Sequence, residues 1–441
     1  MALDLRLCRS VIEEERPRVG GALRRLNGST LEARLPGART GAIFRIPSRD
    51  SEDLLAEVIG FKESDAVLAP FAEPRGVSPG DPVIPEGMTD VQLLGEQILG
   101  RVLDPLGRPI DDRPLREGEF RVPLYQTAPN PMARRPIDSP IHTGVSVIDL
   151  MTTVGEGQRM GLFAGAGVGK STLLGMLARF SSADVNVVAL IGERGREVRS
   201  FIEEELGPEG LARSVVIVAT GDSAPILRIR ASFLAATVAE FFRERGRKVL
   251  LMMDSLTRLA HAAREVGLAG GEPPTTRGYP PSVFSLLPRL LERAGNSSAR
   301  GSLTAFYTVL VDGDDMNEPI SDAARSILDG HIVLSRRIAE THRFPAVDIS
   351  ASLSRLANEI VDPSHAQVAG RVRSILAGYE EVRDLIQVGA YRQGTDPETD
   401  RIVRLQPRIV DFFRQDRRVA RDSVEDLAGL EAIIGEEGPL V

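Results

Sequence analysis

The sequence predicts an α/β fold in which a parallel-sheet core follows an N-terminal β-barrel and precedes a C-terminal helical domain. Between about residues 141 and 355, apolar strand-like runs alternate with helical segments, as in a parallel sheet that is covered on both faces. Residues 19–90 contain short aliphatic runs separated by turns, which is typical of a small antiparallel barrel. After residue 363 the strand pattern fades and amphipathic helical spacing replaces it.

The chain of 441 residues is long enough for about three domains. We expect an N-terminal segment at 1–18, a β-barrel domain at 19–95, a core domain at 96–362 and a helical domain at 363–441. The proline-dense stretch 104–140 favours an extended connector inside the core domain.

The elements follow this order. In the barrel domain, aliphatic runs begin at Leu31, Gly41 and Leu54, and clusters of Asn, Gly, Pro and Asp between them predict turns. The expected buried strands of the core are Val185–Ile191, Ser214–Ala219, Val249–Met253 and Leu303–Val311, with helices that include Arg228–Arg243 and Val283–Ala294. In the C-terminal domain, amphipathic spacing predicts helices over Arg371–Ile386 and Arg408–Gln415.

The segment from Phe163 to Thr172 has the composition of a phosphate-binding loop. An apolar run precedes its glycines and apolar residues at helical spacing follow them, which is the strand–loop–helix context that such a loop requires. Backbone N–H groups and the positive end of the helix dipole would bind phosphate oxygens. The predicted nucleotide-binding residues are Gly165, Ala166, Gly167, Val168, Gly169, Lys170, Ser171 and Thr172.

Two side chains of this loop have predicted roles of their own. Lys170 would reach the β- and γ-phosphates of a nucleoside triphosphate, and the Ser171 hydroxyl would bind Mg²⁺. Ala164 stands at the first position of the motif, where glycine is usual, and its short side chain can fit there. The alternative is a glycine-rich turn with a chance Lys-Ser pair.

Two carboxylates follow apolar runs in the same domain. Asp254 ends the run Val249–Met253 and would hold Mg²⁺, partly through water. Glu193 ends another run and can polarise a water for attack on the γ-phosphorus, while Arg194 neutralises part of the local charge. The alternatives are that Asp254 caps a helix and that Glu193 belongs to a solvated Glu-Arg cluster. Lys170 in the same domain favours the catalytic interpretation.

A third acidic stretch, Asp312 to Pro319, also follows a strand-like run. It would either position the nucleotide or form a turn, because Asp and Asn favour turns for backbone reasons.

Composition argues against several classes of protein. The formal charge is −8, aromatic residues make up 5% and tryptophan is absent, which argues against a nucleic-acid binder. The five histidines lack metal-ligand spacing, so we expect no zinc site. Cys8 is the single cysteine, which fits a reducing compartment, and we expect neither a membrane span nor a secretory signal.

The run Gly-Glu-Arg-Gly-Arg-Glu-Val at 192–198 resembles the hexameric rotary ATPases, a class that includes the catalytic beta subunit of ATP synthase. Four further stretches narrow the likeness. They closely resemble the type III protein-export ATPases and lie at Asp254–Arg258, Gly271–Phe284, Gly313–Ile320 and Ser326–Arg336. The resemblance covers about residues 20–420.

The resemblance implies a RecA-like P-loop NTPase core that hydrolyses ATP, in a homohexamer that holds nucleotide between subunits. Arg355, the last residue of a Ser-Ala-Ser-Leu-Ser-Arg run, matches the arginine that reaches into the neighbouring site. Such an arginine is worth about 10³ to 10⁵ in rate in analogous enzymes. Phe344 matches the aromatic residue that packs on the adenine ring. Arg355 thus joins Lys170, Glu193 and Arg194 in the implied catalytic set.

The same resemblance implies a cytoplasmic ATPase, peripheral at the inner face of the cell membrane, that energises protein export. Its implied partners are regulatory stator-like and central-stalk-like subunits of the export apparatus, export chaperones and export substrates, with no nucleic acid. Flagellar members contact a regulator and the membrane through an amphipathic N-terminal segment. Residues 1–18 depart from that pattern, because they are few and Glu13–Pro17 interrupts any apolar face.

Several short stretches resemble the flagellar branch more than the injectisome branch, namely Pro273–Gly278, Met316–Pro319, Gly389–Tyr391 and Gly394–Pro397. The alternatives are an injectisome type III secretion ATPase, the catalytic subunit of a proton-translocating rotary ATP synthase, a nucleic-acid translocase and a non-catalytic nucleotide-binding subunit. The export-type run Gly271–Phe284 argues against the rotary synthase, and Glu193 argues against a non-catalytic subunit. Flagellar genes beside this one would decide the branch.

Overall fold

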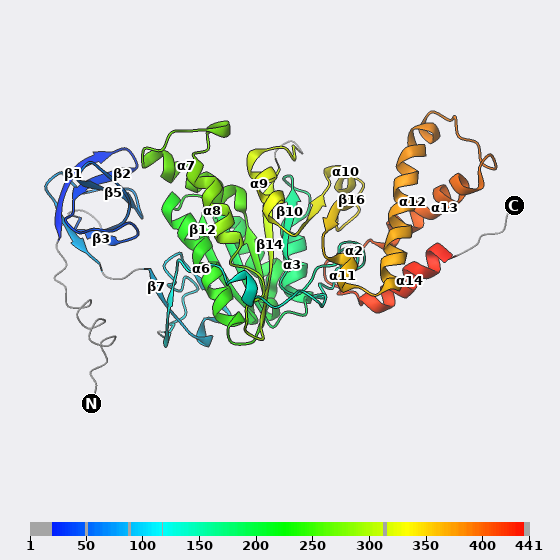
Figure 1. Ribbon diagram of the computed structural model, residues 1–441, viewed down its shortest axis with the longest axis horizontal. Coiled ribbons are helices and arrows are strands. Elements are labelled where there is room, and N and C mark those ends of the chain that lie inside the picture. Colours follow the sequence, from blue (N-terminus) through cyan, green and yellow to red (C-terminus); the bar gives the residue numbers. More distant parts are fainter. Residues whose placement is uncertain (1–19, 49–51, 87–89, 117, 312–314, 436–441) are drawn as a thin grey trace.

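The computed structural model describes residues 20–48, 52–86, 90–116, 118–311 and 315–435. A barrel, a central α/β domain and a group of C-terminal helices follow one another along the long axis of the molecule (Figure 1). This arrangement confirms the predicted fold class. The expected N-terminal segment 1–18 and residues 312–314 of the acidic stretch lie outside the described residues.

Six antiparallel strands close the N-terminal barrel in the order β1-β2-β5-β4-β3-β6. Their bounds are β1 Gly21–Asn27, β2 Thr30–Arg34, β3 Ile43–Ile46, β4 Leu54–Lys62, β5 Asp65–Pro70 and β6 Pro82–Pro85. Alternate residues fill the interior, such as Leu31 and Ala33 on β2 and Ala56 and Val58 on β4. The predicted aliphatic runs at Leu31, Gly41 and Leu54 therefore correspond to β2, β3 and β4.

An eight-stranded sheet forms the centre of the molecule, in the order β16-β15-β10-β14-β13-β11-β12-β8. The strands are β8 Arg101–Leu103, β10 Arg159–Ala164, β11 Val185–Glu193, β12 Ser214–Thr220, β13 Lys248–Asp254, β14 Ser302–Leu310, β15 Gly330–Leu334 and β16 Val347–Ser354. Only the pair β15–β16 is antiparallel among the pairs of this sheet. The carboxyl ends of the parallel strands consequently meet at one edge, where open α/β sheets bind their ligands.

Helices cover both faces of this sheet and form the C-terminal unit. The central helices are α2 Ser146–Met151, α3 Lys170–Phe180, α4 Gly195–Ser200, α5 Gly207–Ala212, α6 Pro225–Arg243, α7 Leu256–Ala269, α8 Pro281–Leu291, α9 Pro319–Ile327, α10 Arg336–Glu340 and α11 Ala357–Ile360. The C-terminal helices are α12 Pro363–Gln387, α13 Pro397–Phe412 and α14 Ser423–Gly435. The short turns are η1 Glu96–Ile98, η2 Pro131–Ala133 and η4 Thr276–Gly278, and η3 Phe201–Leu206 is a π-helical turn.

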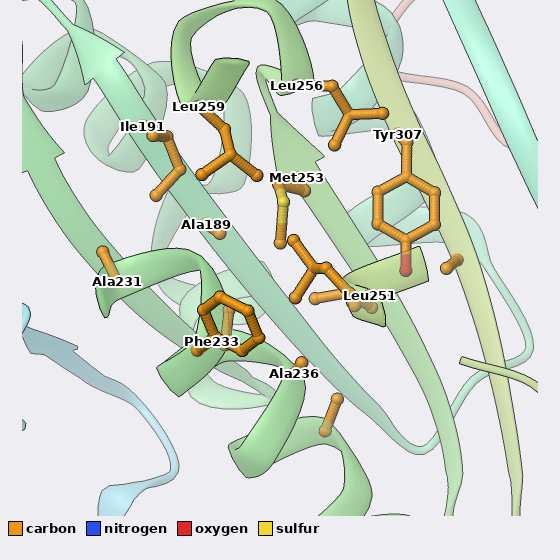
Figure 2. Close-up of a cluster of buried hydrophobic side chains, with 14 of the residues drawn as sticks. Ala189, Ile191, Ala231, Phe233, Ala236, Leu251, Met253, Leu256, Leu259 and Tyr307 are labelled. Carbon is orange, nitrogen blue, oxygen red and sulfur yellow. The ribbon is translucent and has the colours of Figure 1, made fainter. Parts of the chain in front are cut away.

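Side chains alternate between the two faces along each strand, as the pleat of a strand requires. Figure 2 shows Ala189 and Ile191 of β11 in one apolar cluster with Phe233 of α6. Val188 and Leu190, the intervening residues, belong to a second cluster on the opposite face with α2 and α3. The C-terminal helices contribute to this second cluster, so they pack on the same side of the molecule as the helix that follows the phosphate loop.

Two segments differ from the expected organisation. β7 (Val91–Leu94) falls within the expected barrel domain 19–95 but pairs with β9 (Phe120–Pro123) outside the barrel. Leu94 is buried among residues of the central domain, and this burial accounts for the pairing. The expected helix Arg408–Gln415 is the end of α13, which stops at Phe412 and leaves Gln415 in a loop.

Candidate active site

The phosphate loop joins β10 to α3 at the carboxyl edge of the sheet. Gly167 and Gly169 adopt φ values of 76° and 92°, which only glycine adopts without strain. No atom lies within 4 Å of the position that a Cβ at Gly167 would take, so space remains beside the loop. Val168, which is buried, anchors the loop on the core. The predicted turn thus presents its backbone and the α3 N-terminus at the edge where ligands bind.

Lys170, the first residue of α3, joins the two predicted carboxylates. Its Nζ lies 2.5 Å from Oδ1 of Asp254 and 3.5 Å from Oε1 of Glu193. These carboxylates end the adjacent strands β13 and β11, and β14 separates β13 from β10. Burial lowers the pKa of Lys170, but the two carboxylates outweigh burial and hold the pKa above its usual value. The lysine therefore stays charged and available for a phosphate.

Asp254 is held in place by a threonine of the intervening strand. Thr308 of β14 donates a hydrogen bond from Oγ1 to Oδ1 of Asp254 at 2.7 Å. Both side chains are buried. The sequence did not predict this contact, because Thr308 is one of several hydroxyl residues within the largely apolar run of β14. The hydroxyl fixes the carboxylate at the position where Lys170 meets it.

Glu193 has the electrostatic surroundings of a general base. Burial raises its pKa to about 7, and the negative charge of Asp254 acts in the same direction. Lys170 opposes the shift, and a hydrogen bond with Glu197 adds to it. A carboxyl group with a pKa near the working pH is suited to accepting a proton during a reaction.

Gly192 brings the end of β11 against Arg258 of α7. It has a φ of 74°, and a Cβ at this position would come within 2.9 Å of the Arg258 Cβ. The Nε of Arg258 is buried and has no hydrogen-bond partner among the described residues. A buried guanidinium donor without an acceptor fits an anionic ligand. Arg258 ends the stretch Asp254–Arg258 that resembles the export ATPases, but the sequence pattern predicted no role for its side chain.

A pocket of about 560 Å³ opens beside the phosphate loop, and its lining includes Gly167, Gly169, Thr172 and Phe344. Phe344 is 42% exposed although it is a large apolar residue. The loop after α13 closes the other side, and the backbone N–H of Gln415 donates to the Phe344 carbonyl at 3.0 Å. A partly exposed aromatic ring next to the loop fits the flat face of a nucleotide base.

Arg194 and Arg355 lie apart from the group around Lys170. The Arg194 side chain is 82% exposed and forms an ion pair with Glu197 at 3.5 Å. Arg355 is exposed as well, and its Nη2 donates to the carbonyl of Arg325 at 3.3 Å.

Strand register shows how far Arg355 lies from the phosphate loop of its own chain. Ser354, the last residue of β16, pairs with Gly330, and Gly330 pairs with Met160 at the start of β10. The phosphate loop begins after Ala164, at the other end of β10. Four residues of strand span about 13 Å. Arg355 therefore occupies the edge of the sheet opposite its own loop.

The residues present fit a magnesium ion held together with phosphate. Ser171 supplies an exposed hydroxyl at the start of α3, and Asp254 supplies a fixed carboxylate. Mg²⁺ is usually bound by one or two protein oxygens, phosphates and water, not by a complete protein cage. The described residues contain no group of three or more His, Cys, Asp or Glu side chains placed to hold a metal.

No helix in the described part of the chain combines the length and the apolar character that a membrane crossing needs.

Three family descriptions match successive parts of the chain. The β-barrel domain of the ATP synthase alpha/beta family matches residues 26–87, and the nucleotide-binding domain of that family matches residues 144–354. The C-terminal domain of the type III secretion ATPase EscN matches residues 361–432.

Individual relatives are similar over most of their length. A flagellum-specific ATP synthase from Bacillus subtilis is 46% identical over 419 residues, which is 95% of each chain. A type 3 secretion system ATPase from Xanthomonas euvesicatoria is 54% identical over 376 residues, 85% of each chain. The assembled ATPase EscN of enteropathogenic E. coli, solved with its central stalk EscO, superposes with a TM-score of 0.87 at 44% identity, over 94% of this chain and 100% of that one.

The phosphate loop, the paired strand-end carboxylates and these matches along nearly the whole sequence lead to one conclusion. The chain belongs to the type III protein-export ATPases, the group within the ATP synthase alpha/beta family that contains the flagellum-specific ATP synthases and the type 3 secretion system ATPases.

Proposed function

We propose that this protein hydrolyses ATP to ADP and phosphate and thereby energises type III protein export, at active sites shared between the subunits of a homohexamer. One observation carries the proposal most directly. A single charged lysine of a phosphate loop lies between a fixed carboxylate, Asp254, and a carboxyl group with a raised pKa, Glu193. Binding alone needs the loop and the lysine; the raised pKa at the neighbouring strand end adds the base that hydrolysis needs.

In the proposed reaction, water attacks the γ-phosphorus in line with the bond to the leaving ADP oxygen. Glu193 accepts a proton from that water, and the P–O bond to ADP breaks to release phosphate. Lys170, which exchanges Asp254 for phosphate oxygens when ATP binds, neutralises charge on the β- and γ-phosphates. Arg258 supplies a further buried donor beside the end of β11.

The remaining nucleotide contacts come from the loop and the pocket beside it. Backbone N–H groups of 165–172 would bind phosphate oxygens, and Phe344 would stack on the base. Ser171 and Asp254 would hold Mg²⁺, which supplies charge neutralisation at the phosphates. Arg194, exposed next to Glu193, would contact bound phosphate.

Arg355 would serve the active site of a neighbouring subunit, because it lies at the far edge of the sheet from its own loop. A head-to-tail interface that closes into a ring presents one edge of each subunit to the opposite edge of the next. An arginine delivered in this way stabilises charge in the transition state.

We further propose a cytoplasmic location at the inner face of the membrane. The partners would be a central stalk, regulatory stator-like subunits, export chaperones and export substrates. EscN, whose structure is similar to this chain, forms a complex with a central stalk. We propose the flagellar branch because four short stretches resemble it, namely Pro273–Gly278, Met316–Pro319, Gly389–Tyr391 and Gly394–Pro397. The second candidate is an injectisome ATPase, which the match to the EscN C-terminal domain and the identity of 54% to a secretion ATPase favour.

Two variants test the catalytic proposal. Lys170→Ala should abolish both ATP binding and hydrolysis, whereas Glu193→Gln should keep binding and lower kcat by about 10² to 10⁴. Steady-state ATPase assays and nucleotide titrations measure the two effects separately. Lys248→Ala is the matched control, because it removes an exposed lysine from the opposite end of the same sheet. If Glu193→Gln hydrolysed ATP at the wild-type rate while Lys170→Ala stayed inactive, the assignment of the base would be wrong.

A further inference from the structure

A buried carboxylate that the proposed mechanism does not use lies behind the phosphate loop. Glu205 belongs to the π-helical turn η3, and its side chain is 10% exposed. Its Oε1 accepts a hydrogen bond from the hydroxyl of Thr172 at 2.9 Å and an ion pair from Nη1 of Arg417 at 3.4 Å. Thr172 lies in the first turn of α3, and Arg417 lies in the loop between the C-terminal helices α13 and α14.

The helix that follows the phosphate loop is shaped to receive this carboxylate. Gly175 occupies the interior of α3, where glycine destabilises a helix by about 0.5–1 kcal/mol relative to alanine. A Cβ at Gly175 would come within 2.7 Å of the Glu205 Cβ and 3.1 Å of its Oε2. The missing side chain therefore makes the room that Glu205 occupies. π-Helical turns inside helical segments are frequent at functional sites.

Two partners of Glu205 form part of the nucleotide pocket, and a third, Nη1 of Arg179, lies 4.0 Å from its Oε2. Thr172 and Arg417 both line the pocket that contains Phe344. Arg179, in the last turn of α3, donates from Nη2 to the carbonyl of Arg417 at 2.6 Å. Helix α3 thus holds the Arg417 loop at two points. Near the start of the helix, Thr172 binds Glu205, which pairs with Arg417. Near the end of the helix, Arg179 binds the Arg417 carbonyl directly.

Gln415 fixes the same loop on the opposite side of the pocket. Its side-chain Nε2 donates to the Gly144 carbonyl at 2.7 Å, and its Oε1 accepts from the Ser146 backbone N–H at 3.1 Å. Its backbone N–H binds the Phe344 carbonyl. The loop 415–418 is therefore attached both to the segment that carries the base-stacking ring and to the helix that carries the phosphate loop.

We propose that Glu205 is a positioning residue, and that Glu205 and Arg417 form a latch which couples nucleotide binding to docking of the C-terminal helices. This inference rests on the proposed function, because it assumes that the pocket binds ATP. With the latch closed, Thr172 and the loop 415–418 stay in place as walls of the pocket beside the phosphate loop. With the latch broken, the loop keeps its bonds from Arg179 and Gln415, but Thr172 and the Arg417 side chain lose the carboxylate that holds them together at the pocket wall.

Linkage makes this coupling reciprocal. If docking of the loop raises nucleotide affinity, bound nucleotide must stabilise the docked loop by the same factor. Couplings of this kind usually amount to between about 5-fold and 150-fold. Because the latch acts on the pocket wall and leaves Glu193 in place, its loss should raise KM and leave kcat close to the wild-type value.

The test is a titration of the full-length protein with mant-ADP, a fluorescent ADP, in Glu205→Gln, Arg417→Ala and the double variant. We expect each single variant to bind about 10-fold more weakly and the double variant to bind no more weakly than either one, because both break the same latch. Arg417→Lys should recover part of the affinity. Hydrogen exchange at 415–418 should be slowed by ADP in the wild type and unchanged by ADP in Arg417→Ala.

Arg414→Ala is the matched control, because Arg414 precedes the same loop and carries the same charge but pairs with Asp411 and does not line the pocket. The latch is contradicted if Arg414→Ala weakens binding as much as Arg417→Ala, or if the two latch variants have additive effects. It is equally contradicted if both bind ADP as tightly as the wild type. Should Glu205→Gln fail to fold, Gly175→Ala gives the same prediction by displacing Glu205. A wild-type protein that bound no nucleotide would refute the proposed function itself. If the wild type binds nucleotide and the latch variants bind it equally tightly, only the latch is refuted.

Discussion

The two ends of β16 differ in what they do for an active site. At its start, Val347 pairs with Leu334, and Phe344 just before it lines the pocket beside the phosphate loop of the same chain. At its end, Ser354 pairs with Gly330 at the opposite edge of the sheet, and Arg355 follows there. This antiparallel strand therefore places Phe344 near the phosphate loop of its own chain and Arg355 at the far edge of the sheet.

Under the proposed function, this difference would let one chain contribute to two sites. The phosphate loop, Glu193 and Asp254 meet because parallel strands bring their carboxyl ends to a common edge. Arg355 is excluded from that edge by the reversed direction of β16. In the proposed ring, each subunit would hold a binding site with its base, and the next subunit would supply the arginine.

The largest effect expected from this comparison is at Arg355. Arg355→Ala should lower kcat by about 10³ to 10⁵, since the transition state loses a charge supplied from the neighbouring subunit. Nucleotide affinity should stay nearly unchanged, because the residue lies away from the pocket of its own chain. ATPase assays and mant-ADP titrations measure both quantities. Arg325→Ala, which removes a charge from the same surface, is the control, and an equal loss in that variant would contradict a specific role.

A smaller effect is expected from pH at the carboxyl edge. Because the pKa of Glu193 is raised to about 7, the carboxylate form needed to accept a proton is lost as the pH falls below about 7. The rate constant kcat/KM should therefore fall about tenfold per pH unit on the acid side of this value. Glu193→Gln should show no such fall, and nucleotide binding by that variant over the same pH range controls for titration of ATP. A wild-type profile that stayed flat down to pH 5 would rule out Glu193 as the base.

The smallest effect is expected at Phe344. Phe344→Ala should weaken nucleotide binding about 10-fold, because stacking of a base on an aromatic side chain contributes roughly 1–3 kcal/mol. The value of kcat should change little, since the ring lies away from the reacting atoms. Phe61→Ala, which removes another partly exposed phenylalanine from the barrel, is the control. Unchanged affinity in Phe344→Ala would mean that the pocket beside the loop does not hold the base.

Local patterns were sufficient to predict the elements and the residues at strand ends. The glycines before Lys170 require a tight turn, and the apolar runs that form β11 and β13 end at Glu193 and Asp254. A parallel sheet then brings these ends together without further information. The same reasoning predicted three barrel strands, because their aliphatic runs are bounded by Gly, Pro and Asn.

Contacts between distant segments could not be predicted in this way. Thr308 and Glu205 become meaningful only when their strands and helices are placed beside the loop, since neither belongs to a motif. β7 does not join the barrel, because its Leu94 packs in the hydrophobic core of the central domain. Gln415 was expected in a helix, whereas its position depends on contacts with Gly144 and Phe344, more than 70 residues away along the chain.

The central claim, that each active site combines the base of one subunit with the arginine of the next, is tested most directly by mixing two inactive variants. Glu193→Gln keeps a functional Arg355, and Arg355→Ala keeps a functional phosphate loop with Glu193. Random mixing in a ring pairs the intact halves at about a quarter of the interfaces. We predict that the mixed assembly recovers ATPase activity well above the sum of the two variants alone. Activity equal to that sum, in oligomers shown by differential tags to contain both variants, would contradict a shared site.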